Sequence, residues 1–355
     1  MIPYFILLFT VLIIFYFKEK TSSNKIIRKF YLRIGFLILV LFAGLRDMVV
    51  GSDTSGYAIR FENKKISLDT FFSSSYTNEW GYHFIEFIAA LFSNEYVAIL
   101  IVTASIAVFF QLKAINKISN LPLVSIFILI TFGIYTYVFN GARQALAAAI
   151  YMYSIIFLIQ GNFRKYTIWI LIAFLFHKSV IFGIPLYFLF RKKFTKKLVF
   201  LLILFALTLS TFFNVFLDFT DIFNLGYSSY QEIDVQGGTI LTLIYFILSI
   251  FYILMRSNIN RIYLSKYDIF LNMFIFGTII CIVVYFTGSY VEITRLAFYY
   301  LTTVIFIWPI ILKSLKNETR LVFSSIFVIT HLTFYYIFIT KMGDLYPYLL
   351  NRSIF

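Results

Sequence analysis

Apolar residues along the chain fall into long runs that are separated by short charged segments. An α-helix needs about 20 mostly apolar residues to cross a hydrocarbon core of about 30 Å. Runs such as Leu121–Phe139 and Asp268–Thr287 approach this length, and similar runs recur from end to end. The pattern predicts an all-α, polytopic membrane protein of about twelve crossings, built as a single integral membrane domain over residues 1–355.

Each predicted helix ends where charged or glycine-containing segments begin. The run Tyr166–Phe190 is interrupted at His177 and is expected to go out and back, while Tyr82–Phe92 is too short to span and predicts an interfacial or re-entrant helix. The other predicted helices are Tyr4–Phe17, Phe30–Leu45, Tyr96–Leu112, Leu121–Phe139, Ala145–Ile159, Leu198–Leu217, Thr239–Met255, Asp268–Thr287, Arg295–Leu312 and Leu321–Thr340.

Basic clusters predict the orientation of these helices. Lys and Arg gather in segments such as Lys18–Lys29 and Arg191–Lys197, and basic segments favour the cytoplasmic side of a membrane. Both termini and the loops over about residues 46–81 and 218–238 are then extracytoplasmic. The second loop fits this side because it holds four carboxylates, those of Asp218, Asp221, Glu232 and Asp234, and no basic residue.

Composition excludes several classes of function. The chain is 61% hydrophobic and only 13% charged, which is about half the charged fraction of a soluble domain. Its net charge of +14 lies in loops between apolar runs, so no nucleic-acid partner is expected. The lone Cys281 and the three histidines give neither a disulfide framework nor a metal site. We expect no cofactor.

Three arginines depart from the cytoplasmic bias of basic residues. Arg46, Arg143 and Arg295 each stand where an apolar run meets the predicted external face. The guanidinium group presents a fork of donors that suits phosphate oxygens. Together they predict a site for a diphosphate whose lipid tail stays in the bilayer. The alternative is that each pairs with a nearby carboxylate, as Arg46 could with Asp53, or extends to lipid headgroups.

Two residues are predicted as a general base at the same face. His177 lies between two short apolar runs, and its unperturbed pKa of about 6.5 suits proton transfer. Asp53 is the competing base, and the sequence leaves the choice open. Asp47, Tyr57 and Gln144 adjoin these groups and are expected to provide secondary substrate contacts.

Several segments resemble motifs of the EpsG family, a branch of the Wzy-type polysaccharide polymerases. Arg46–Tyr57 is similar to the family's R-x-x-x-x-G-x-D-T-x-x-Y, and Arg143–Ala147 to its R-Q-x-x-A. His177-Lys178-Ser179 resembles H-x-S, although Val180 replaces the usual small residue that follows. A late arginine–aromatic segment at Thr294–Tyr300 and a closing Pro-Tyr at Tyr346–Tyr348 complete the order.

This resemblance implies an extracytoplasmic glycosyltransferase with a helical membrane fold related to the GT-C class. Such polymerases move a growing glycan from one polyprenyl diphosphate, usually undecaprenyl diphosphate, onto another lipid-linked repeat unit. The implied setting is a bacterial inner membrane with the active site facing the periplasm or cell exterior, and a chain-length regulator protein is a further implied partner. Whether the product is O-antigen, capsule or exopolysaccharide is left open.

Two other classes compete with this interpretation. A flippase or transporter of lipid-linked oligosaccharide would use the same arginines without chemistry, but transporters commonly place intramembrane charge near the midplane and show internal repeats. A membrane acyltransferase would need a histidine that an acyl donor reaches from the cytoplasm, whereas His177 is predicted on the other side. The charges at one face favour the external enzyme.

Overall fold

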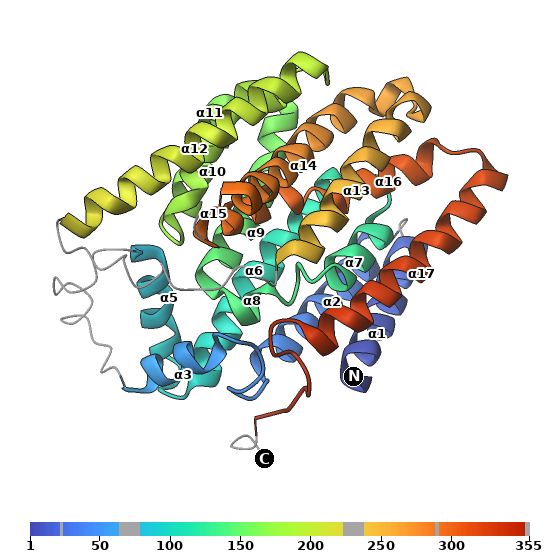
Figure 1. Cartoon of the computed structure of the whole chain (residues 1–355). Helices are drawn as coiled ribbons and strands as arrows, with labels where there is room; N and C mark the ends of the chain where they lie inside the picture. Colours follow the sequence, from blue (N-terminus) through green and yellow to red (C-terminus); the bar gives the residue numbers. More distant parts are fainter. Residues whose placement is uncertain (22–23, 64–78, 223–237, 288–290, 352–355) are drawn as a thin grey trace. The chain divides into compact units, whose positions relative to one another are not determined.

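The structure is a computed structural model that describes residues 1–21, 24–63, 79–222, 238–287 and 291–351 (Figure 1). Over these residues the regular elements are helices, and the one β-type pairing is an isolated antiparallel bridge between Arg46 and Leu350. The predicted all-α, polytopic membrane fold is confirmed.

The described helices form two successive sets along the chain. The first set is α1 (Ile2–Lys20), α2 (Lys25–Gly44), α3 (Thr54–Asn63), α5 (Trp80–Ala90), α6 (Tyr96–Ile118), α7 (Pro122–Thr131), α8 (Tyr137–Asn140), α9 (Ala142–Gln160) and α10 (Phe163–Phe174). The second set is the 3₁₀ helix η1 (Lys178–Phe182), α11 (Gly183–Phe190), α12 (Lys196–Ile222), α13 (Thr239–Met255), the 3₁₀ helix η4 (Arg256–Asn258), α14 (Arg261–Thr287), α15 (Val291–Leu301), α16 (Val304–Ser314) and α17 (Asn317–Lys341).

The chain divides into two compact units. The first comprises Met1–Ile156, Arg164–Ile181 and Lys316–Phe355, and the second comprises Phe157–Phe163 and Phe182–Leu315. The helix α9 begins in the first unit and ends in the second. The two units are defined by packing alone, so a single integral membrane domain over residues 1–355 stays a prediction.

The first unit is built around α6. This helix packs against α2, α3, α5, α7 and α8, and α1 packs against both α2 and α7. Small residues such as Ala104 and Ala107 are fully or almost fully buried on α6, which lets neighbouring helix backbones approach closely in a membrane protein. α17 completes this unit by packing against α7 (Figure 1).

The second unit is built around α14, which contacts α11, α12, α13, α15 and α16. The most apolar stretch of α14 is 83% buried, whereas that of Thr239–Asn258, which contains α13, is only 11% buried. An apolar helix with few buried residues is suited to contact with lipid, because lipid tails can cover the apolar side chains that other helices leave uncovered. The two helices therefore illustrate the core and the lipid-facing rim of this unit.

Seven helices of the described chain are long and apolar enough to cross a membrane. The predicted number of about twelve counted shorter elements as well, among them α7 and the pair formed by η1 and α11. These segments are apolar but span only 10 to 17 residues each. The exact number of crossings therefore stays a prediction.

Several predicted boundaries are confirmed, and others shift. The predicted interruption at His177 is present between α10 and η1, and the short helix predicted over Tyr82–Phe92 is α5. The run Leu121–Phe139 is split into α7 and α8, because Gly133 adopts φ +74° and turns the chain. Arg295–Leu312 is similarly divided between α15 and α16.

The two predicted external loops are only partly described. Within residues 46–81 the structure contains α3 and the start of α5, and residues 64–78 lie outside the described part. α12 continues to Ile222, so the first residues of the expected loop 218–238 are helical. Glu232 and Asp234 lie outside the described residues.

The C-terminal segment Met342–Asn351 crosses the turn that follows α2. The backbone N–H of Asp47 donates to the Leu349 carbonyl at 2.9 Å, and that of Asn351 donates to the Leu45 carbonyl at 2.9 Å. Gly51 donates to the Asp344 carbonyl at 2.9 Å. The segment at the end of the chain thus fixes the turn that carries the first predicted motif.

Candidate functional site

Arg46 begins the first motif and is buried, with 2% of its surface exposed. Its guanidinium donates to the backbone carbonyls of Ala43 and Val50 (Nε to the Val50 oxygen, 3.3 Å) and to Thr54 Oγ1 (3.1 Å from Nη2). It also stacks over the Phe139 ring, 4.0 Å from the ring centroid. Burial lowers the pKa of Arg46 to about 10, so the group stays charged near neutral pH.

These contacts favour a structural role for Arg46. Arg46 was expected to pair with a carboxylate such as that of Asp53, but the side chain that accepts its hydrogen bond is the neighbouring Thr54. The single hydrogen of the Thr54 hydroxyl has two backbone carbonyls in reach, those of Val50 (2.8 Å) and Phe139 (3.0 Å). Diphosphate binding by Arg46 stays a prediction, but its donors already have protein acceptors.

The two aspartates of this motif shape the backbone. The Asp47 carboxylate accepts from the Val49 N–H at 3.1 Å, as in an Asx turn. Asp53 precedes α3, accepts the Tyr57 N–H on its carbonyl at 3.2 Å, and receives the Ser52 hydroxyl on its carboxylate at 3.2 Å. Both side chains are half-buried.

Gly51 is required by this turn. It adopts φ +98°, and a Cβ built there would lie 2.7 Å from the Phe139 carbonyl oxygen. Only glycine tolerates both this left-handed backbone and this close approach. The neighbouring Ser52 N–H donates to Asn140 Oδ1 at 3.1 Å, which links the first motif to the residue that closes α8.

Arg143 lies in the first turn of α9, at the amino end of a helix of 19 residues. Its Nη1 donates to Glu79 Oε2 at 2.6 Å, and its Nε donates to the Tyr57 hydroxyl at 3.5 Å. Its side chain keeps 36% of its surface exposed. A guanidinium beside a helix amino terminus is a favourable setting for an anion, because the backbone dipole adds to the side-chain charge.

Glu79 joins Arg143 to His177. One carboxylate oxygen, Oε2, takes the Arg143 donor, and the other, Oε1, lies 2.9 Å from His177 Nδ1. The Glu79 side chain is 11% exposed and that of His177 is 27% exposed. We call Tyr57, Glu79, Arg143 and His177 the carboxylate-bridged cluster. It combines a cation, a titratable imidazole and a phenol within one polar group of the first unit.

A close backbone approach places Glu79 beside His177. The Gly81 N–H donates to the Leu175 carbonyl at 2.8 Å, which attaches the start of α5 to the chain just after α10. A Cβ built on Gly81 would lie 2.9 Å from that carbonyl oxygen. The absence of a side chain at Gly81 therefore permits Glu79 to reach the break that carries His177.

The structure brings together three of the predicted site residues, namely Tyr57, Arg143 and His177. Tyr57 also packs its ring against Tyr82, with the ring centroids 5.4 Å apart. Gln144 adjoins Arg143 in sequence but is buried, and its Oε1 accepts the Tyr137 hydroxyl at 2.6 Å. Gln144 thus supports the packing of α8 against the start of α9.

Arg295 belongs to the second unit. It lies on α15 and is half-buried. Its predicted contact with a diphosphate stays a prediction.

A second charged group follows the cluster along α5. Arg60 Nη2 contacts Glu86 Oε1 at 3.0 Å, and His83 Nδ1 contacts Glu86 Oε2 at 2.9 Å. The Glu86 side chain is 2% exposed. Its pairing with Arg60 compensates the burial of the carboxylate and ties α5 to α3.

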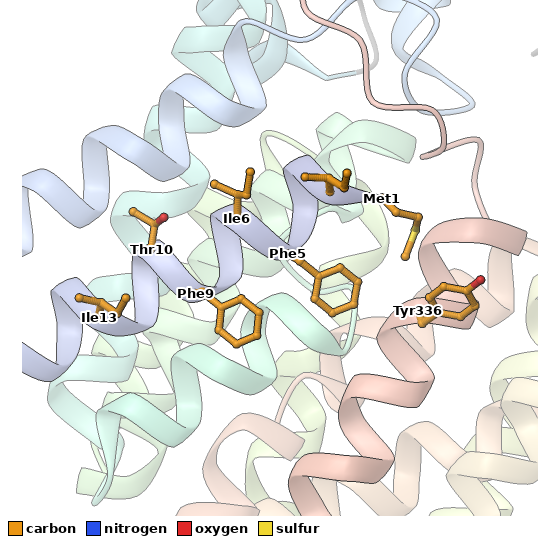
Figure 2. A pocket seen from close by; sticks show the side chains of 8 residues that line it. Met1, Phe5, Ile6, Phe9, Thr10, Ile13 and Tyr336 are labelled. Atoms are coloured by element: carbon orange, nitrogen blue, oxygen red, sulfur yellow. The ribbon is translucent and has the colours of Figure 1, made fainter.

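An apolar groove lies elsewhere in the first unit. It has a volume of about 430 Å³ and is lined by Phe5, Phe9 and Ile13 of α1 and by Tyr336 of α17 (Figure 2). None of the predicted site residues lines it. Its composition suits contact with lipid tails.

Glu79 was missed by the sequence predictions, and so was its link to both partners. A usable signal was present, because Glu79 and His83 are four residues apart at the start of a short helix and Glu86 follows three residues later. This spacing would set all three on one face of a helix that included Glu79, whereas in the structure Glu79 directly precedes α5. Among the described residues, no group of three or more His, Cys, Asp or Glu side chains is arranged to hold a metal ion.

Comparison with known proteins assigns the chain to a family. The model of the EpsG family matches residues 29–350 of the 355. No curated protein and no solved structure matches the chain, so the predicted relation to the GT-C class stays a prediction. The matched segment contains every residue of the carboxylate-bridged cluster, from Tyr57 to His177. With nine-tenths of its length covered by this model, the chain belongs to the EpsG family.

Proposed function

We propose that the protein is a polysaccharide polymerase that transfers a glycan from one polyprenyl diphosphate to a second lipid-linked repeat unit. Membership of the EpsG family implies a polymerase-type function in polysaccharide synthesis. The lipid-linked donor and acceptor, the position at the outer face of a bacterial inner membrane, and the chain-length regulator belong to this proposal.

The observation that carries the proposal is the carboxylate-bridged cluster. It holds a partly exposed guanidinium and a partly exposed imidazole on the two oxygens of one carboxylate. Glycosyl transfer from a lipid diphosphate needs both kinds of group, since negative charge develops on the leaving diphosphate while the acceptor hydroxyl loses a proton.

In the proposed reaction Arg143 and the amino terminus of α9 stabilise the leaving diphosphate. The acceptor oxygen bonds to the anomeric carbon as the bond from that carbon to the diphosphate oxygen breaks. The diphosphate departs with the electron pair, and His177 takes the hydroxyl proton. Between the two predicted bases His177 is favoured, because it shares Glu79 with Arg143 whereas the Asp53 carboxylate is engaged with Ser52.

The test uses purified protein with its lipid-diphosphate-linked repeat unit, and products are separated on a gel. We expect a ladder of increasing glycan length. Arg143→Ala should reduce the rate by about 10²–10³-fold, the scale of a lost charge stabiliser, whereas Arg28→Ala should change little because Arg28 is an exposed residue of α2. Normal chain lengths in Arg143→Ala would contradict the proposal. Intact substrate that binds in an arginine-dependent manner would indicate a flippase instead.

A further inference from the structure

We infer that Glu79 is a positioning residue that fixes the tautomer of His177 while it also holds Arg143. The inference rests on the proposed function, in which His177 accepts the proton of the acceptor hydroxyl. It adds a residue that the motifs did not indicate and gives that residue a role that only a carboxylate can fill.

The first step concerns His177. Its Nδ1 lies 2.9 Å from Glu79 Oε1. An ionised carboxylate only accepts hydrogen bonds, so Nδ1 must carry the hydrogen. In neutral imidazole the other nitrogen, Nε2, then presents a lone pair. The contact therefore leaves His177 in the form that can take up a proton at Nε2.

The second step concerns Arg143. Its guanidinium has only donors, and Nη1 donates to Glu79 Oε2 at 2.6 Å. Glu79 thus receives donors on both oxygens at once. A glutamine at this position has one oxygen and one NH₂ group. The permanent charge of Arg143 would claim the oxygen, and the NH₂ group would face His177 Nδ1.

The consequence is specific to Glu79→Gln. With an NH₂ group in front of it, Nδ1 must become the acceptor, and the hydrogen moves to Nε2. The side chain keeps its size, and both hydrogen bonds persist, but the nitrogen that serves as base is blocked. A histidine held in the wrong tautomer by such an acid-to-amide change costs up to about 10⁴-fold in turnover elsewhere.

The experiment reads the tautomer directly by ¹⁵N NMR of histidine-labelled protein. The chain has only three histidines, and His177→Gln identifies the signal of His177. Spectra are taken at alkaline pH, in the range where the ¹⁵N shifts no longer change as the pH is raised, so that only the neutral ring is observed. We expect hydrogen on Nδ1 in the unaltered protein and on Nε2 in Glu79→Gln. Turnover of the lipid-linked substrate should fall while its KM stays nearly constant, because Arg143 remains in place.

Three further variants make the result decisive. Glu95→Gln is the matched control, because Glu95 also precedes its helix, α6, without capping it and is exposed. Arg143→Met should keep hydrogen on Nδ1, since Glu79 still accepts from His177. Glu79→Asp retains a carboxylate and should also keep hydrogen on Nδ1, which provides a second test if Glu79→Gln folds poorly. Hydrogen on Nδ1 in Glu79→Gln, or its loss in Arg143→Met, would overturn the inference.

Failure of the inference differs from failure of the proposed function. Absence of polymer with the unaltered protein refutes the polymerase, while the tautomer of His177 still shows whether Glu79 sets it. A shifted tautomer with unchanged polymer formation refutes the role of Glu79 in catalysis and leaves the polymerase intact. A loss of turnover in Glu95→Gln as large as that in Glu79→Gln would also overturn the inference.

Discussion

Arg46 and Arg143 show how the same residue type takes two different roles in one chain. Arg46 is enclosed, and its donors meet the carbonyls of Ala43 and Val50 and the Thr54 hydroxyl. Arg143 keeps about a third of its side chain exposed and shares its acceptor with His177. The two arginines could not be distinguished by their positions in the sequence, since each follows or begins an apolar run. The structure distinguishes them, because among the described residues backbone carbonyls surround the guanidinium of Arg46 only.

The burial of Arg46 predicts a loss of stability in Arg46→Lys. A single ammonium group cannot reach all the acceptors that the planar guanidinium fork contacts, so buried oxygens lose their partners. We expect a loss of about 2–4 kcal/mol in the free energy of unfolding, because each unsatisfied buried group costs about 1–3 kcal/mol. Thermal unfolding in detergent measures this. Arg28→Lys, at an exposed position, is the control. An unchanged melting temperature with weakened substrate binding would support the diphosphate role instead.

At the scale of elements, the site depends on how closely α5 approaches the end of α10. Gly81 is in α5, and a Cβ there would meet the Leu175 carbonyl oxygen at 2.9 Å. Gly81→Ala should therefore push the start of α5 away from Leu175 and separate Glu79 from His177. We expect a drop in polymer formation with little change in expression. Gly56→Ala is the matched control, because a Cβ at Gly56, in α3, meets nothing within 4 Å. Equal activity in the two variants would contradict this account.

The element scale also shows what the sequence could predict. Apolar runs between charged segments located most helices, and Thr239–Met255 is α13 with the same bounds. The break at His177 was equally visible, because polar residues interrupt an apolar run there. The partner of His177 was not visible, since Glu79 lies 98 positions away and reaches it only through the Gly81–Leu175 contact. Such a contact is a property of tertiary packing, which periodicity does not contain.

For the whole molecule, the proposed function depends on the orientation of the chain in the membrane. The basic clusters predict that residues 46–81 lie outside and the segment Arg191–Lys197 inside. Ser52 and Lys193 are both exposed, and each lies in one of these two predicted segments. The native Cys281 is buried, so a cysteine introduced elsewhere can be labelled after Cys281→Ser removes any background.

The expected result is that Ser52→Cys reacts with a membrane-impermeant maleimide on intact cells, whereas Lys193→Cys reacts only after the membrane is opened. The charge difference between the two loops sets this orientation during insertion. Because Asp53 directly follows Ser52, and Tyr57 lies one turn further along α3, external labelling at Ser52 would put the carboxylate-bridged cluster near the face where a lipid-linked glycan is polymerised. Labelling of Lys193→Cys on intact cells, with Ser52→Cys protected, would invert the topology and exclude an extracytoplasmic polymerase.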